Sequence, residues 1–224
     1  MPAAKTPPRP SLRLVRHLLK SYPAVLAVDE VGRGPAAGPC TVGVVLCLPA
    51  LPAPPAGLAD SKALTPTRRR NLIEPIRAWA PTAVAHATAA EVDEWGISLA
   101  LTLAFRRALS LLPPHPTALV LLDGSYDWAN PKPQLLLPPE LCAAPPLAVQ
   151  TLIRGDASCA AISAASVLAK ETRDELMIGL DAKYPGYDLA ANKGYLSPAH
   201  VKGLKTLGFS PCHRRSWSYE RVLG

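Results

Sequence analysis

The chain has 224 residues, of which 49% are hydrophobic and 18% charged, so it has enough apolar residues for one domain with a substantial core and is not an intrinsically disordered protein. Its 24 Lys and Arg residues outnumber its 17 Asp and Glu residues, and the formal net charge of +7 fits a polyanionic partner without establishing one. No apolar run is long enough for a membrane helix, and the N-terminus lacks an apolar signal core, so we expect a soluble cytoplasmic protein.

The predicted strands and helices alternate along the chain, which indicates the α/β class. The expected strands are apolar runs at 24–29, 40–48, 82–89, 119–122 and 147–153. The expected helices lie at 11–20, 66–79, 97–112 and 157–183. Residues 1–10 and 48–57 each hold four prolines and are expected to be irregular.

The stretch Asp29-Glu30-Val31-Gly32-Arg33-Gly34 directly follows the first buried strand. Its two acids can hold a hard cation. Its glycines let the backbone approach a ligand closely, and its arginine offers a fork of donors suited to phosphate. Metal binding beside phosphate recognition suggests an enzyme that acts on a phosphodiester. The plainer interpretation, a strand that ends in a polar turn, does not explain this combination.

Four carboxylates are expected where strands end or a helix begins: Asp29, Glu30, Asp123 and Asp156. Strand ends from separate segments can converge at one edge of a sheet, where like charges raise one another's pKa unless cations neutralise them. All-oxygen ligands favour Mg²⁺ or Mn²⁺ over zinc, and two ions roughly 4 Å apart can straddle a scissile phosphate. These four residues are therefore the predicted metal ligands and catalytic residues of a hydrolase that leaves 5′-phosphate and 3′-hydroxyl ends.

Two of these assignments have open alternatives. Adjacent strand residues point to opposite faces, so Asp29 and Glu30 can face one ion only if the strand ends or bulges between them, or if Glu30 binds through its backbone carbonyl. Asp156 has a second role available, as the N-cap of the long helix.

The basic surplus is concentrated near the C-terminus. Residues 193–224 hold six Lys or Arg residues and one acid, and Tyr195, Trp217 and Tyr219 are interleaved with them. Basic and aromatic residues together suit contact with a nucleic-acid backbone and stacking on sugars or bases, although a solvated basic tail has the same composition. The five cysteines lack zinc-site spacing and are expected to be free thiols in a reducing cytosol.

The chain resembles ribonuclease HII, the type 2 ribonuclease H, from about residue 22 to residue 222. Asp29 through Gly34 resembles the signature of that family, and further matches follow in the family's order. They are Asp60-Ser61-Lys62, Leu122-Asp123-Gly124, Gly155-Asp156, Ile162 through Lys170, Arg173-Asp174, Lys193-Gly194-Tyr195 and His213 through Ser216.

The resemblance implies a ribonuclease H-like mixed central sheet flanked by helices, with a helical C-terminal extension. It divides the chain into an N-terminal tail and short helix (1–21), a catalytic domain (22–184) and a basic extension that contributes to substrate binding (185–224). It implies an endonuclease that cuts the RNA strand of RNA–DNA hybrids and cuts 5′ of single ribonucleotides in duplex DNA, as in ribonucleotide excision repair. We also expect two Mg²⁺ or Mn²⁺ ions in the active complex and a monomeric protein. We expect no membrane association, and replication or repair proteins as partners.

The resemblance also assigns the substrate contacts. The backbone of Gly32-Arg33-Gly34 would meet the 2′-hydroxyl, which distinguishes RNA from DNA, and the adjacent phosphates. Tyr195 would pack on the deoxyribose that follows the ribonucleotide. The remaining expected nucleic-acid contacts are Lys62, Arg214 and Arg215.

Some of these residues also have plainer roles. Lys170 and Asp174 are four residues apart and fit an ordinary helical ion pair better than direct catalysis. His213 fits a structural role as well as a phosphate contact, and Tyr195 on its own could be a core or surface tyrosine.

Two other functions compete with the hybrid nuclease. Another two-metal nuclease or recombinase would need the acids but neither Gly-Arg-Gly nor the tyrosine. A non-catalytic nucleic-acid-binding protein would need the basic C-terminus but not four converging acids.

Overall fold

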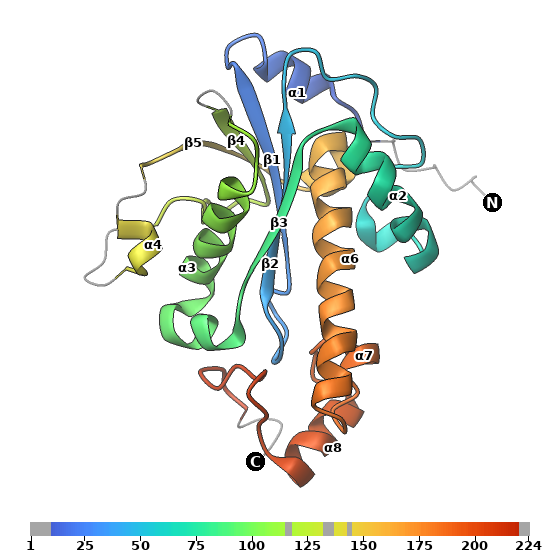
Figure 1. Ribbon diagram of the computed structural model, residues 1–224, viewed down its shortest axis with the longest axis vertical. Helices are drawn as coiled ribbons and strands as arrows, with labels where there is room; N and C mark the ends of the chain where they lie inside the picture. Colours follow the sequence, from blue (N-terminus) through green and yellow to red (C-terminus); the bar gives the residue numbers. More distant parts are fainter. Residues whose placement is uncertain (1–9, 115–117, 132–136, 143–144, 220–224) are drawn as a thin grey trace, which may run out of the picture.

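The computed structural model describes residues 10–114, 118–131, 137–142 and 145–219. Its centre is a five-stranded sheet in the order β3-β2-β1-β4-β5 (Figure 1). β1, β2 and β3 are antiparallel neighbours, whereas β4 runs parallel to β1 and β5 runs parallel to β4. The predicted α/β class with a mixed central sheet is confirmed. The strands are β1 (Ala24–Val31), β2 (Cys40–Cys47), β3 (Thr82–Ala87), β4 (Ala118–Asp123) and β5 (Ala148–Leu152).

Helices cover both faces of this sheet, with α3 and α6 on opposite sides (Figure 1). Most of the remaining helices lie around the ends and edges of the two long ones. The helices are α1 (Arg13–Leu18), α2 (Pro66–Trp79), α3 (Ala89–Ser110), α4 (Pro139–Cys142), α5 (Gly155–Ser158), α6 (Ala160–Lys183), α7 (Leu189–Asn192) and α8 (Pro198–Leu207), with one 3₁₀ turn at Ser61–Ala63.

The alternation of side chains along β1 divides the core into two parts. Val25 and Ala27 pack on the α6 side, whereas Leu26 and Val28 pack on the α3 side. Gly43 of β2 lets α6 come very close, because a Cβ built there would lie 2.3 Å from the carbonyl oxygen of Ala165. The small residues of the first half of α6 therefore lie directly on the sheet.

Two predicted helices differ from the observed ones. The helix expected at 97–112 begins at Ala89, because Thr88 and Glu91 form a capping box, and Gly96 then interrupts the helical backbone. The helix expected at 157–183 is two helices, because Cys159 takes an extended conformation between α5 and α6. The strand expected to end at 29 continues to Val31.

The C-terminal part of the chain packs against the second half of α6 (Figure 1). Its apolar contacts join Met177, Tyr187, Leu189 and Leu204 to the loop at Ala36 and Ala37. The five cysteines are free thiols, as expected. Among the residues that the structure describes, no helix combines the length and the apolar character that crossing a membrane requires.

Candidate active site

The pairing of β1 with β4 brings Asp29 and Asp123 together. The parallel register ends with Val28 opposite Leu122, so each acid is the next residue on its strand. Both acids follow the odd-numbered alternation that faces α6, and Asp29 accepts a hydrogen bond from the hydroxyl of Ser166 on that helix. Two carboxylates 94 positions apart in the sequence thus meet on one face of the sheet.

Glu30 lies on the other face of β1. The strand neither ends nor bulges after Asp29, since Asp29 pairs with Gly43 and Glu30 pairs with Val42 in unbroken register. The side chain of Glu30 lies 3.7 Å from the guanidinium of Arg33. The indole N–H of Trp128 is buried and makes no hydrogen bond within the described ranges, although it is close enough to Glu30 to oppose the rise in its pKa.

Asp156 is placed beside Asp123 by the turn into α5. The backbone N–H groups of Gly155 and Asp156 both donate to Oδ1 of Asp123, at 2.6 and 3.3 Å. The N-cap alternative for Asp156 is wrong, because α6 begins at Ala160 with Cys159 as its N-cap. Its carboxylate instead lies 3.2 Å from the ammonium group of Lys62.

These four side chains, hereafter the acidic cluster (Asp29, Glu30, Asp123 and Asp156), are coupled electrostatically. Burial raises the pKa of Asp29 well above its ordinary value, and repulsion from Glu30 and Asp123 adds to the rise. Burial also raises the pKa of Glu30, with Arg33 opposing the shift. Burial followed by repulsion from Asp156 raises the pKa of Asp123, while backbone hydrogen bonds lower it. Burial and mutual repulsion together therefore disfavour the ionised forms of Asp29, Glu30 and Asp123.

The donor chemistry of the acidic cluster fits a hard divalent cation, since all the side-chain donors are carboxylate oxygens. The side chains do not enclose an ion as they stand: within the described residues, no three Asp, Glu, His or Cys side chains are arranged to hold one. The cluster is thus an array of coupled acids and not a closed cage.

A buried polar network holds the segment that carries Lys62 against α6. The hydroxyls of Ser61 and Ser166 are 2.9 Å apart. Arg69 of α2 is buried, pairs with Glu171 of α6, and donates to the carbonyls of Ser61 and Leu64. Lys62 itself is exposed, and its pKa is raised because Asp156 and other acids outweigh the opposing effect of burial.

The predicted helical pair of Lys170 and Asp174 is confirmed, with 2.6 Å between ammonium and carboxylate. Asp174 also lies 3.8 Å from the guanidinium of Arg69. The pair thus belongs to the network that supports Lys62.

Two buried arginines hold the loop that follows β1. Arg214 has no exposed surface and donates to the carbonyls of Gly32, Arg33 and Gly38. Arg173 is 1% exposed and donates to the carbonyls of Ala37, Pro39 and Lys193. The prediction that Arg214 contacts nucleic acid is corrected here, because a fully buried side chain cannot reach a substrate.

The arginines turn the carbonyls of this loop inward. Within the described part of the chain, the N–H groups of Gly32, Arg33 and Gly34 donate to no other group. Gly32 has a positive φ of 82°, and a Cβ there would lie 2.1 Å from Nε of Arg173. Only glycine fits at this position, and the loop keeps its backbone donors available for a ligand.

Tyr195 lies against the same loop. A Cβ built on Gly34 would be 3.7 Å from the ring of Tyr195, a residue that is 55% exposed. The carbonyl of the preceding residue, Gly194, accepts hydrogen bonds from the N–H groups of Ala36 and Ala37. The C-terminal extension therefore delivers an exposed aromatic ring to the edge of the Gly32–Gly34 loop.

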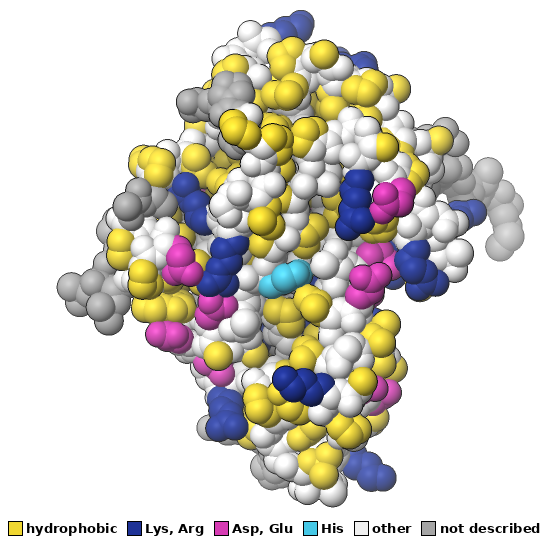
Figure 2. Space-filling view, in the orientation of Figure 1, with side chains coloured by type: hydrophobic (Ala, Val, Ile, Leu, Met, Phe, Trp, Pro, Cys, Tyr) yellow, Lys and Arg dark blue, Asp and Glu magenta, His cyan; other side chains and the backbone are white. Residues whose placement is uncertain are grey.

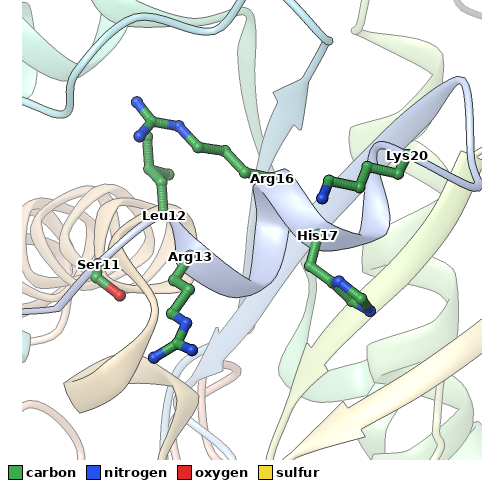
Figure 3. Close-up of a pocket in the computed structure, with 6 residues that line it drawn as sticks. All are labelled: Ser11, Leu12, Arg13, Arg16, His17 and Lys20. Atoms are coloured by element: carbon green, nitrogen blue, oxygen red, sulfur yellow. The ribbon is translucent and has the colours of Figure 1, made fainter.

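The other predicted basic contacts are spread more widely. Arg215 is exposed, while its backbone N–H donates to Asp93. On the face shown in Figure 2, Lys and Arg side chains are scattered among acidic and hydrophobic ones and form no continuous patch. Sequence reasoning expected a helix at 11–20 but assigned no role to its basic residues. Arg13, Arg16, His17 and Lys20, in α1 and just after it, line a surface cavity of about 440 Å³ (Figure 3).

His213 has the structural role that was one of its two expected functions. It is 2% exposed, and its Nε2 lies 2.9 Å from Nε2 of the buried His200. Burial, then the neighbouring His200, lowers the pKa of His213 to about 4. Burial lowers the pKa of His200 as well.

The lowered pKa of His213 leads to a prediction about the pH dependence of stability. The unfolded chain takes up a proton on His213 as the pH falls through about 6.5, whereas the folded protein resists this protonation until about pH 4. Between pH 7 and 4.5 the native protein should lose about 1–3 kcal/mol more stability than a His213→Gln variant in urea unfolding. The acidic cluster shifts stability in the opposite direction but is common to both proteins. If the unfolding free energies of the native protein and of His213→Gln fell in parallel with pH, the lowered pKa of His213 would be contradicted.

Sequence reasoning also overlooked Ser166, Arg69 and Trp128 as neighbours of the acids. Ser166 lies in a matched motif, which was a usable signal. Arg69 lies in the helix expected at 66–79, and no local pattern distinguishes it from Arg68 and Arg70. Trp128 gave no signal, because its approach to Glu30 depends on the return of the chain after β4.

The chain was then compared with known proteins. Residues 26–220 match the family model described as Ribonuclease HII. Ribonuclease HII of Streptomyces avermitilis is 43% identical over 200 residues, which cover 89% of this chain and 78% of that protein. The crystal structure of ribonuclease H2 from Pyrococcus horikoshii OT3 superposes with a TM-score of 0.66 and 27% identity, over 89% of this chain and 96% of that one. The Mn²⁺ complex of Bst-RNase HIII, at 19% identity and a TM-score of 0.63, covers 94% of this chain and 71% of that one and shares the fold.

Proposed function

The chain belongs to the ribonuclease HII family and is a ribonuclease H that cleaves the RNA strand of RNA–DNA hybrids endonucleolytically, leaving 5′-phosphate ends; we propose that it also cuts 5′ of single ribonucleotides embedded in duplex DNA. The observation that carries this proposal is one juxtaposition. The β1–β4 pairing sets Asp29 beside Asp123, and β1 leads directly into the loop against which Tyr195 lies.

The acidic cluster would provide the catalytic centre. Asp29 and Asp123 on the α6 face, with Asp156 beside Asp123, would hold Mg²⁺ or Mn²⁺, and Glu30 would join them from the opposite face of β1. When bound, two such ions would supply an activated water and stabilise the departing 3′ oxygen. Neutralisation of the cluster would reverse the rise in the pKa values of Asp29, Glu30 and Asp123. The Mn²⁺ complex of a protein with this fold is in keeping with such a role.

The residues around the cluster would bind and orient the substrate. The N–H groups of Gly32, Arg33 and Gly34, which donate to no group in the described part of the chain, are suited to the 2′-hydroxyl and the phosphates beside it. Arg33, Lys62 and Arg215 are exposed cations available to the phosphate backbone. Arg214 would contribute indirectly, because it holds the carbonyls of the loop and does not contact the substrate itself. The expected replication or repair partners and the monomeric state remain predictions.

A duplex with one ribonucleotide tests the proposal directly. With Mg²⁺ or Mn²⁺, the protein should nick that strand on the 5′ side of the ribonucleotide and leave an all-DNA duplex intact. A long RNA–DNA hybrid serves as the positive control for the family activity. Cleavage of the hybrid without any nick in the single-ribonucleotide duplex, under both metals, would refute the proposal.

Tyr195 should matter most where RNA meets DNA. Its exposed ring can pack on a deoxyribose, so Tyr195→Ala should lower kcat/KM on the single-ribonucleotide duplex roughly 10- to 100-fold, and on a long hybrid far less, because each stacking contact is worth about 1–3 kcal/mol. Steady-state kinetics on both substrates measures the ratio. Tyr22→Ala removes another exposed tyrosine, at the start of β1, and is the matched control. Equal losses on both substrates would contradict the assigned role.

A further inference from the structure

Two buried histidines connect the end of the chain to Tyr195. His200 in α8 is fully buried, and its Nδ1 lies 2.9 Å from the backbone carbonyl oxygen of Tyr195. Its Nε2 lies 2.9 Å from Nε2 of His213. Nδ1 of His213 lies 3.0 Å from the backbone nitrogen of Ser210 and 2.8 Å from its hydroxyl. Four groups thus form one continuous chain of hydrogen bonds.

The backbone fixes the direction of this chain. The N–H of Ser210 can only donate, so Nδ1 of His213 is an acceptor and the proton of the neutral ring is on Nε2. That proton is donated to Nε2 of His200, whose own proton must then be on Nδ1. His200 therefore donates to the carbonyl of Tyr195, which can only accept. Every donor and acceptor in this chain of hydrogen bonds has a partner when both imidazole rings are neutral.

We propose that His200, held in this tautomer by His213, is a positioning residue that sets Tyr195 for its encounter with the RNA–DNA junction. The proposal rests on the proposed role of Tyr195. The carbonyl of Tyr195 is held from one side of its own turn by the N–H of Ser197 and from α8 by His200. Tyr195 is more than half exposed, so the position of its ring depends on the backbone that carries it.

Several observations support a positioning role over simple packing. The same turn is fixed at each of its groups: the N–H of Tyr195 donates to the carbonyl of Asn192, and the N–H of Gly194 donates to the side chain of Asn192. His213 also pairs with the loop after β1, since Ala37 and His213 form an isolated β-bridge. The hydrogen-bonded pair of His200 and His213 thus connects the loop Gly32–Gly34 to the tyrosine beside it. The lowered pKa values keep both rings neutral at physiological pH.

Two substitutions at His200 separate the two ends of the ring. Asparagine places an N–H donor near the position of Nδ1 and loses the contact with His213, whereas glutamine reaches the position of Nε2 and loses the donor to Tyr195. Both remove the ring and part of the packing. We expect His200→Gln to lower kcat/KM on the single-ribonucleotide duplex roughly tenfold, with less than a threefold loss on a long hybrid, because displaced reacting groups lose rate steeply. His200→Asn should keep the native ratio.

Tyr195→Ala and thermal unfolding complete the experiment. Similar melting temperatures for the two His200 variants show that folding does not explain the difference. Retention of the native ratio by His200→Gln, equal losses on both substrates, or a junction-selective loss in His200→Asn would each overturn the proposal. If Tyr195→Ala itself leaves the ratio unchanged, the failure lies with the proposed role of Tyr195. If Tyr195→Ala changes the ratio and His200→Gln does not, only the proposed positioning role of His200 is refuted.

Discussion

Asp123→Asn should lower kcat on a long RNA–DNA hybrid by at least roughly 10²–10³-fold, the scale on which electrostatic groups in active sites act. The substitution keeps the shape of the side chain. The amide oxygen can still accept the hydrogen bonds from Gly155 and Asp156, so α5 should keep its place. What disappears is one negative charge from the acidic cluster.

The same substitution should not destabilise the fold. Repulsion from Asp123 contributes to the raised pKa values of Asp29 and Glu30, so its removal relieves like-charge strain. We therefore expect an inactive protein whose melting temperature is unchanged or higher, and which still binds hybrid. Such a trade of stability against activity is common at functional sites.

Single-turnover cleavage, binding and thermal unfolding together measure this outcome. Asp188→Asn is the matched control, because Asp188 is exposed and has a positive φ of 57°, a conformation that asparagine accepts readily. It should cleave like the native protein. An active Asp123→Asn protein would contradict the catalytic assignment, and an unfolded one would contradict the electrostatic explanation.

Arg214→Lys should destabilise the protein by about 2–5 kcal/mol, although it conserves the charge. The guanidinium donates to three carbonyls, those of Gly32, Arg33 and Gly38, from a fixed planar fork. An ammonium group cannot reach all three, and each buried carbonyl left without a partner costs about 1–3 kcal/mol. The guanidinium, 5.2 Å from the ring centre of Trp217, is also lost as a partner for that ring.

Urea unfolding measures the loss, and Arg215→Lys is the control, since that neighbouring side chain is exposed. Arg214→Lys should also raise KM, because its carbonyls belong to the loop proposed to bind substrate. Native stability in Arg214→Lys would show that the loop is held by other contacts and would contradict the supporting role of Arg214.

The order and class of the strands and of the longest helices could be predicted from the sequence, whereas α4, α7 and α8 were not located. Each buried strand is a local apolar run between turn residues, so its position depends on neighbours in the chain. The helix boundaries were harder. The start of α3 at Ala89 depends on the Thr88–Glu91 capping box, and the break at Cys159 depends on contacts that Ser11 makes with Ser158 and Ala160.

The candidate site, too, could be predicted only in part from the sequence. The types of residue required for the chemistry, acids at strand ends and a Gly-Arg-Gly turn, were visible in the sequence. The parallel β1–β4 register decided that Asp29 and Asp123 meet, and the uninterrupted β1 decided that Glu30 faces the other way.

The sequence by itself determined the chemistry of this protein, because carboxylates, glycines and basic residues have fixed properties wherever they lie. Only the tertiary structure decided which of two adjacent arginines is a support and which is free. Arg214 is fully buried and Arg215 is exposed. The physical reason is that burial depends on the carbonyls of Gly32, Arg33 and Gly38, which folding brings to Arg214 from far away in the chain.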